Sequence, residues 1–212
     1  MRTLLCFGDS NTHGTLPMQE LGAQGRYARR HRWTTLLQEA LPDWEVIAEG
    51  HPGRTTLHDD PIEGPHRNGR RVLPALLETH RPIDAVLVML GTNDLKERFS
   101  VNAGDIALSV ERLIRDIRGS GAAPMGGAPG VLVVAPPPIL ETGCLAGIFA
   151  GGAAKSARLG AEIGAMAARN GVPFLDAGEI IRVSAVDGIH YDPEANPALA
   201  AAFAKAIRQA FD

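Results

Sequence analysis

The feature that most constrains the fold of this chain is a regular alternation between two kinds of apolar segment. Short, uninterrupted apolar runs occur at 3–7, 45–49, 84–90, 131–135 and 172–175. Uninterrupted hydrophobicity over so few residues is typical of strands that are covered on both faces. Between these runs, apolar residues recur every three or four positions, which is the spacing of helices that pack on one face.

The helical spacing is found at 33–41, 72–77, 106–117, 153–169 and 194–211. Strands that alternate with helices predict an α/β fold with a parallel sheet and helices on both sides. The Gly- and Pro-rich segment 119–130 indicates a loop, but the same alternation resumes after it, so we expect one domain over residues 1–212. The long loops 15–31 and 136–152 are expected to be binding loops, lids or interfaces.

Composition excludes several classes of protein. A formal net charge of -3 gives no general electrostatic reason to bind nucleic acid or an anionic membrane. Two cysteines, Cys6 and Cys144, rule out a disulfide-built scaffold and fit a reducing compartment. The apolar run near the N-terminus is too short to span a membrane and lacks a small-residue cleavage site. We therefore expect a cytoplasmic protein.

Polar residues that could perform chemistry follow the predicted strands. Ser10 follows the first strand, Gly53 the second and Asn93 the third, while Asp187 and His190 come after the fifth. Ligands of open parallel sheets bind beyond the carboxyl ends of the strands. Together these residues supply the groups needed for acyl transfer through a serine.

The chemistry assigns each group a role. A serine hydroxyl is a poor nucleophile at neutral pH, so Ser10 needs a base, and His190 is the candidate. Asp187, three residues earlier, would fix the tautomer of that imidazole and stabilise the imidazolium. The backbone amides of Ser10 and Gly53 and the side-chain amide of Asn93 are candidate donors to the oxyanion of the tetrahedral intermediate.

These motifs, in this order, resemble those of the SGNH (GDSL) hydrolase family: Gly8-Asp9-Ser10, a central Gly53, Gly91-Thr92-Asn93-Asp94 and Asp187-Gly188-Ile189-His190. The resemblance implies a flavodoxin-like three-layer α/β/α sandwich with a five-stranded parallel sheet in the order 2-1-3-4-5. It also implies catalytic Ser10, Asp187 and His190, an oxyanion hole of Ser10, Gly53 and Asn93, and neither metal nor cofactor.

Two positions depart from the family pattern. Asn11 stands where the GDSL label has leucine, which predicts a more polar pocket beside the nucleophile and makes Asn11 a candidate substrate-binding residue. Glu49 lies near the place where the family often has an asparagine, and its role stays open.

A narrower resemblance, to the bacterial arylesterase/acyltransferase branch, rests on Arg54-Thr55-Thr56, Pro136-Pro137-Pro138 and the segments 149–152 and 186–190. It implies hydrolysis of short-chain esters such as aryl acetates and acetylated sugars, with acyl transfer to alcohols in some members. It also implies a homo-oligomer, with octamers among its members. The expected walls of a small acyl pocket are apolar residues of one loop together with Ile189. They are Leu140, Leu145, Ile148 and Phe149.

Two rival functions stay open at this point. The apolar loop 139–149 could accept long acyl chains, as a thioesterase or lysophospholipase would require. The small-residue loop 8–15 could instead hold the phosphate of a flavin, although the carboxylate of Asp9 would repel that phosphate and the serine, histidine and carboxylate would have no explanation.

Several further residues are weighed as secondary candidates. His13 and His51 lie on loops near the predicted site and could touch the substrate. The run His58-Asp59-Asp60 has metal-ligand residue types but is too short a signal to predict a metal. The arginine-rich cluster at 26–32 reads as a solvated face, with an oligomer contact or a rim for an anionic substrate as alternatives.

Overall fold

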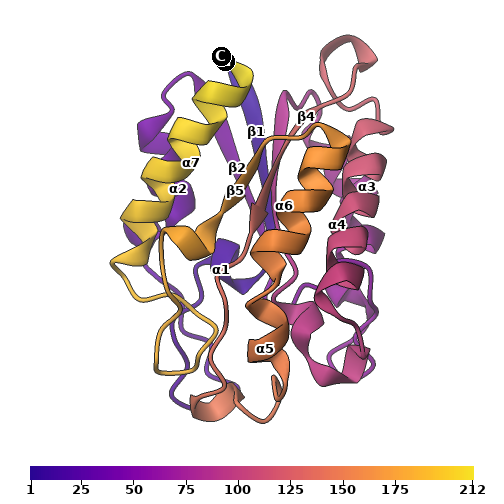
Figure 1. Ribbon diagram of the computed structural model, residues 1–212. Helices are drawn as coiled ribbons and strands as arrows, with labels where there is room; N and C mark the ends of the chain where they lie inside the picture. Colours follow the sequence, from indigo (N-terminus) through magenta and orange to yellow (C-terminus); the bar gives the residue numbers. More distant parts are fainter.

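The computed structural model describes all 212 residues and is built on one five-stranded parallel sheet (Figure 1). The strands lie in the order β2-β1-β3-β4-β5, as predicted. Their bounds are β1 (Arg2–Gly8), β2 (Trp44–Gly50), β3 (Ala85–Met89), β4 (Gly130–Ala135) and β5 (Phe174–Asp176). The register pairs Gly8 at the end of β1 with Gly50 of β2 and Met89 of β3, so these three strands end at the same edge.

Helices cover both faces of the sheet and complete three layers. They are α1 (Ser10–His13), α2 (Trp33–Ala40), α3 (Gly69–His80), α4 (Ala103–Arg118), α5 (Gly152–Ser156), α6 (Leu159–Asn170) and α7 (Ala195–Phe211). In Figure 1, α2 and α7 lie on one side of the sheet, and α3, α4 and α6 lie on the other. The predicted three-layer α/β/α sandwich is therefore confirmed.

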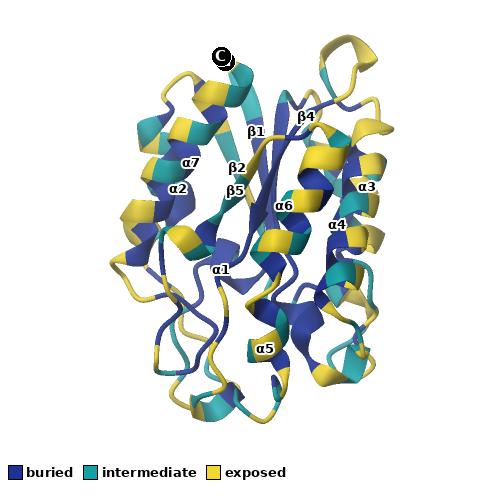
Figure 2. Ribbon diagram, viewed as in Figure 1, coloured by how far each residue is buried: buried dark blue, intermediate teal, exposed yellow.

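Two apolar cores explain why the buried parts of the central strands are apolar throughout. Along β1, Leu4 and Cys6 pack with α2 and α7, while Leu5 and Phe7 pack with the helices of the other layer. Successive side chains of a strand point to opposite faces, so a strand between two helical layers must be apolar throughout. Figure 2 shows this as buried central strands under helices whose outer faces are exposed.

The two edge strands are less apolar than the sequence reading assumed. Glu45 and Glu49 of β2 are exposed or half-buried, since β2 is an edge strand with β1 as its one neighbour. The fifth strand was expected at 172–175 but runs from Phe174 to Asp176, and the Phe174 side chain lies at the exposed edge.

The stretch 153–169 forms two helices rather than the one expected. The first ends at Ser156, whose buried hydroxyl donates to the Ala153 carbonyl and accepts from the Ile139 amide. The second begins at Leu159 and packs so tightly on β5 that a Cβ at Gly160 would lie 1.9 Å from Asp176 Oδ2. Apolar spacing alone does not reveal such a break, because both helices face the same core.

Helix ends follow capping side chains more closely than apolar spacing. The helix α4 begins three residues before the expected start, because Asn102 and Asp105 form a capping box. The helix α3 likewise begins after Asn68, whose side chain accepts from the Arg71 amide. No helix is both long enough and apolar enough to cross a membrane.

Candidate active site

A sharp turn after β1 presents Ser10 at the carboxyl edge of the sheet. The strand ends at Gly8, and Asp9 caps the short helix α1 by accepting a hydrogen bond from the Asn11 amide at 2.9 Å. Glycine is required at position 8, because a Cβ there would lie 2.0 Å from Thr12 Oγ1. The turn therefore places the Ser10 hydroxyl beside the cavity described below, with 6% of the residue exposed.

A compact loop before α7 holds the imidazole and carboxylate. The Ser184 amide donates to the His190 carbonyl at 2.7 Å, and the Gly188 amide donates to the Ser184 carbonyl at 2.9 Å. Gly188 has a φ of +75° and packs so closely on Leu140 that a Cβ would meet its carbonyl oxygen at 2.0 Å. The loop is thus fixed by its own backbone and by the neighbouring loop after β4.

Three side chains form one hydrogen-bonded chain at this edge. His190 Nε2 lies 3.1 Å from Ser10 Oγ, and His190 Nδ1 lies 2.6 Å from Asp187 Oδ2. The serine and the histidine are 180 residues apart in sequence, so the fold alone brings them together. All three residues are buried, which shields their interactions from water.

The Asp187 carboxylate is held in its charged form. Its Oδ1 accepts from the amides of Ile189 and His190, and its Oδ2 accepts from the Met18 amide at 2.7 Å as well as from the imidazole. Burial by itself would raise the pKa of Asp187, but the hydrogen bonds and the charge of His190 lower that pKa to about 2. An anionic Asp187 fixes a proton on Nδ1 and leaves Nε2 free to accept one from serine.

The candidate oxyanion donors are joined by a second network. Asn93 Nδ2 donates to the Arg54 carbonyl at 3.1 Å, which leaves its second N–H available. Gly53 occupies the turn before Arg54 with a φ of +73°, and a Cβ there would lie 2.7 Å from Glu63 Oε2. Both Gly53 and Asn93 line the same cavity as Ser10 and His190.

Arg54 is a buried residue that sequence reasoning used only as a motif marker. Its guanidinium lies 4.4 Å from the centroid of the Phe7 ring and donates to the carbonyls of Gly8 and Glu49. Its own carbonyl accepts from Asn93. Arg54 therefore connects the ends of β1 and β2 to Asn93. A charged residue in the turn that follows β2 was the available signal.

The buried Asp94 fastens the loop after β3 to the segment that follows β2. Its carboxylate accepts from the amide of Thr56 at 3.0 Å and from the Thr56 hydroxyl. Burial raises the pKa of Asp94 above its ordinary value, against these hydrogen bonds. Asp94 therefore has a structural role, since it connects two loops at the edge of the sheet.

These groups border a cavity of about 760 Å³. Both long loops contribute to it, as predicted: residues 21–26 from the first, and Leu145, Ile148 and Phe149 from the second. Ile189 lies on the wall beside His190. The predicted apolar residues therefore border the serine, with the exception of Leu140, which is exposed and does not line the cavity.

The expectation that Asn11 binds substrate is wrong in this structure. Asn11 is buried outside the cavity lining, and its Nδ2 donates to the Ile189 carbonyl at 3.2 Å. Its backbone carbonyl accepts from the indole of Trp33. The turn into α1 directs this side chain into the fold, so Asn11 ties two loops together and adds no polarity to the pocket.

The secondary candidates from the sequence differ in whether they line the cavity. His13 and His51 line the cavity. Glu49 does not, and its carboxylate pairs with His80 at 2.9 Å. Cys6 is buried in β1, and the Cys144 thiol donates to the Met18 carbonyl.

The acidic part of the His58-Asp59-Asp60 run is used in ion pairs. Asp59 pairs with Arg71 at 2.6 Å, and Asp60 pairs with Arg98 at 3.0 Å. No group of three or more His, Cys, Asp or Glu residues is arranged to hold a metal.

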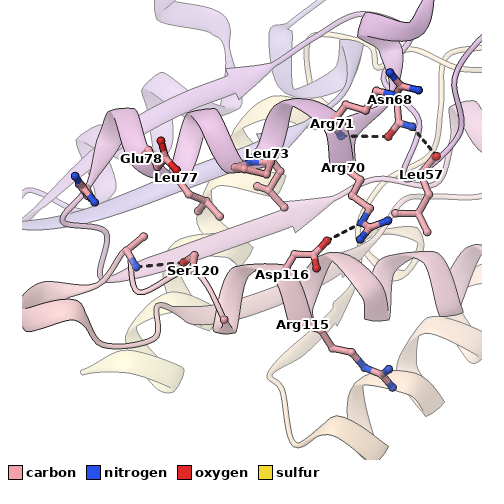
Figure 3. A pocket seen from close by; sticks show the side chains of 14 residues that line it. Leu57, Asn68, Arg70, Arg71, Leu73, Leu77, Glu78, Arg115, Asp116 and Ser120 are labelled. Atoms are coloured by element: carbon pink, nitrogen blue, oxygen red, sulfur yellow. Dashed lines mark hydrogen bonds and ion pairs between the residues drawn. The ribbon is translucent and has the colours of Figure 1, made fainter.

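A second cavity, of about 780 Å³, lies between α3 and α4 (Figure 3). Leu73 and Leu77 of α3 line it, and an Arg70–Asp116 ion pair of 2.8 Å connects the two helices. Its lining contains a serine but no histidine, so it holds no serine–imidazole pair like that of the first cavity.

A parallel α/β sandwich with a buried serine–imidazole–carboxylate chain beyond its strand ends has the architecture of a serine-dependent acyl hydrolase. The model of the GDSL-like Lipase/Acylhydrolase family matches residues 6–208, so this chain belongs to that family. The flavin-binding alternative is not supported by this match.

Solved structures with similar chains agree with this membership. An aryl esterase of M. smegmatis, in its inhibitor-bound form, is 40% identical with a TM-score of 0.94, and 99% of each chain is covered. A carbohydrate acetylesterase from Sinorhizobium meliloti is 37% identical with a TM-score of 0.94 and the same coverage. A lipase/acylhydrolase from Enterococcus faecalis, 19% identical with a TM-score of 0.68 and covered over 96% of its chain against 99% of this one, shares the fold alone. A search of curated proteins finds no match.

Proposed function

We propose that residues 1–212 form one catalytic domain that hydrolyses short-chain, acetyl-type carboxylic esters, such as aryl acetates and acetylated carbohydrates, through an acyl-enzyme. The main observation that supports this proposal is the continuous hydrogen-bonded chain from Ser10 through His190 to Asp187, with contacts of 3.1 Å and 2.6 Å. The similarity to an aryl esterase and a carbohydrate acetylesterase over 99% of the chain supports the acetyl-type substrate.

In the proposed reaction, Ser10 Oγ attacks the ester carbonyl while His190 Nε2 takes its proton. The oxyanion forms beside the second N–H of Asn93 and the backbone amides of Ser10 and Gly53. The imidazolium then protonates the leaving alcohol, and the C–O bond breaks to give the acyl-enzyme. Water attacks this ester with His190 again as base, which releases the carboxylic acid and restores the serine. Where an alcohol replaces that water, the same step transfers the acyl group.

The cavity wall supports a small acyl group. Leu145 and Phe149 are buried, and Ile189 adjoins His190, so the apolar surface beside the serine is already packed against the core. A long acyl chain would have to extend past these side chains into the open part of the cavity. We therefore place the acetyl-type esters ahead of the thioesterase or lysophospholipase alternative. Slower hydrolysis of p-nitrophenyl octanoate than of the acetate is expected, and faster octanoate hydrolysis would contradict the small pocket.

The experiment that tests the function is Ser10→Ala assayed on an aryl acetate and on an acetylated sugar. Both activities should fall by at least about 10³-fold, because the remaining groups can only bind and polarise the ester. Ser100→Ala is the matched control, since Ser100 is an exposed serine outside the cavity. Hydrolysis by Ser10→Ala at the wild-type rate would refute the proposal.

A cytoplasmic homo-oligomer completes the proposal, and the octamer is one of the sizes that the family resemblance implies. The two free thiols, Cys6 and Cys144, support a reducing compartment. The exposed side chains of Leu21, Ile62 and Leu140 are apolar surface that an oligomer contact would cover. Light scattering that gives the monomer mass of 22.5 kDa would refute the oligomer.

A further inference from the structure

Cationic side chains line the cavity that contains Ser10. Arg26, Arg67 and Lys96 all border it, and the single carboxylate in its lining is that of Glu63. Lys96 is committed to that carboxylate at 2.6 Å and to the buried Asp60 at 3.6 Å. The same carboxylate also lies 3.4 Å from Arg67, so Lys96 and Arg67 share one negative charge and Arg26 has no carboxylate partner. Positive charge therefore remains for a ligand at the two arginines.

Arg26 stands at the cavity with most of its donors free. Its Nε donates to the His13 carbonyl at 2.8 Å, which fixes the base of the guanidinium. Its two terminal nitrogens have no protein partner, and no carboxylate forms an ion pair with it. A guanidinium presents two parallel N–H donors that match the two oxygens of a carboxylate.

Arg67 supplies a second guanidinium beside the candidate oxyanion hole. Its Nη1 donates to the Pro52 carbonyl and lies 3.3 Å from His51 Nδ1, while its Nε lies 3.4 Å from Glu63 Oε2. Its Nη2 has no protein partner. The side chain is positioned closely, because a Cβ at Gly53 would lie 3.1 Å from its Nε.

The pKa values of the two cavity imidazoles, His13 and His51, are lowered by burial and by these positive charges. Burial lowers the pKa of His13, and the neighbouring Arg26, Arg32 and His51 lower it further, to about 4. Burial also lowers the pKa of His51, with further contributions from Arg54, Arg67 and His66. Charging either imidazole is thus opposed by neighbouring arginines, of which Arg26 has no carboxylate partner and Arg67 shares Glu63 with Lys96.

We propose that the enzyme prefers esters whose alcohol part carries a carboxylate, and that Arg26 and Arg67 bind this carboxylate. The inference rests on the proposed function. The apolar residues Leu145, Phe149 and Ile189 are assigned to the acyl group, so the charged wall is left for the alcohol. Acetyl esters of acidic sugars or of hydroxyaryl carboxylates are the substrate class that this chemistry describes.

A pair of isosteric esters tests the preference. The 4-acetoxybenzoate anion and neutral 4-acetoxybenzamide have planar groups of the same size and differ in charge. The measured quantity is the ratio of their kcat/KM values, compared between wild type and variants so that leaving-group reactivity cancels. The wild-type ratio should fall when the ionic strength rises from about 0.02 M to about 0.3 M, because salt screens a solvent-accessible ion pair.

Arg26→Gln and Arg67→Gln should each lower that ratio about fivefold or more, through loss of a charge-assisted contact. Arg30→Gln is the matched control, since Arg30 is an exposed arginine of the same loop that does not line the cavity, and it should leave the ratio unchanged. An unchanged ratio in both cavity variants, or an equal fall in Arg30→Gln, would overturn the inference.

Two outcomes separate this inference from others. If Arg67→Gln slowed both esters equally, Arg67 would act at the reacting carbonyl and not on the substrate carboxylate, which overturns its assignment. Hydrolysis of neutral phenyl acetate by each variant, together with its thermal unfolding midpoint, confirms that the variants are folded and active. If wild type hydrolysed neither phenyl acetate nor these esters, the proposed function itself would fail.

Discussion

Replacing Asp187 by asparagine is the sharpest perturbation of the proposed relay, because it changes charge and donors at nearly constant shape. Asp187 accepts four hydrogen bonds, two on each oxygen. An asparagine has one acceptor oxygen, so in either orientation its amino group faces two N–H donors. With the oxygen toward Ile189 and His190, the amino group meets the Met18 amide and drives the imidazole to the tautomer protonated on Nε2.

That tautomer cannot accept a proton from Ser10. The corresponding substitution in serine proteases lowers kcat by about 10⁴. We expect a loss of about 10³- to 10⁴-fold for Asp187→Asn, or about 4 to 5.5 kcal/mol of activation free energy. KM should change little, because Asp187 does not line the cavity.

Stability gives an independent magnitude for the same substitution. The fall in the pKa of Asp187 from 3.8 to about 2 corresponds to about 2 kcal/mol of folding free energy. A carboxyl whose folded pKa lies below its unfolded pKa stabilises the fold above about pH 4, and this contribution is lost as the pH falls toward about pH 2. The free energy of unfolding of wild type should exceed that of Asp187→Asn by about 2 kcal/mol at neutral pH, and this difference should become smaller as the pH falls.

The assay measures kcat and KM with p-nitrophenyl acetate. The free energy of unfolding is measured by urea titration from neutral pH into the acid range. Asp192→Asn is the control, since Asp192 is exposed and two residues from His190. A folded Asp187→Asn enzyme whose kcat stays within about tenfold of wild type would refute the assigned role of the carboxylate.

Three further predictions concern the groups around the serine. Asn93→Ala should lower kcat on p-nitrophenyl acetate by about 10² to 10³ with little change in KM, and an unchanged kcat would remove Asn93 from the oxyanion hole. Gly53→Ala should reduce both kcat and the unfolding midpoint, because alanine rarely adopts a φ of +73° and its Cβ, 2.7 Å from Glu63 Oε2, would also displace that carboxylate; wild-type values of both would contradict this reasoning. Burial raises the pKa of Asp9 to about 6. The folded state therefore binds this proton more tightly than the unfolded state does, and wild-type stability should decline as the pH rises from about 4 to about 6. Asp9→Asn should abolish this decline and be more stable by up to about 3 kcal/mol at neutral pH, as measured by urea unfolding, and a decline that persists unchanged would argue against Asp9 as its source.

The sequence predicts the site well where topology determines position. Ser10, Asn93 and His190 each follow a predicted strand, and parallel strands in one sheet end at one edge, so their proximity follows from the strand order. The parallel sheet and its two helical layers follow from the alternation of apolar segments, whereas the strand order was implied by the family resemblance. Predicting that these three residues lie close together therefore required only the correct strands and their parallel arrangement in one sheet.

Other parts of the site carry no signal of this kind. Met18 contributes a backbone amide to Asp187, and every residue except proline has that group. Arg67 reaches Gly53 through an irregular loop with no periodic pattern. Asn11 was misjudged because its side-chain direction depends on the φ and ψ angles of the turn at Ser10, which composition does not specify.

The hydrogen bond from Met18 to Asp187 also limits how the entrance of this enzyme could be redesigned. The loop 15–31 frames the cavity, and one of its amides completes the coordination of the carboxylate. A shortened or remodelled loop would release that amide together with the segment that meets the substrate. The same loop therefore affects both selectivity and turnover. Exchanging it with the loop of a relative would lower turnover as well as alter selectivity, unless the amide of residue 18 still donated to Asp187.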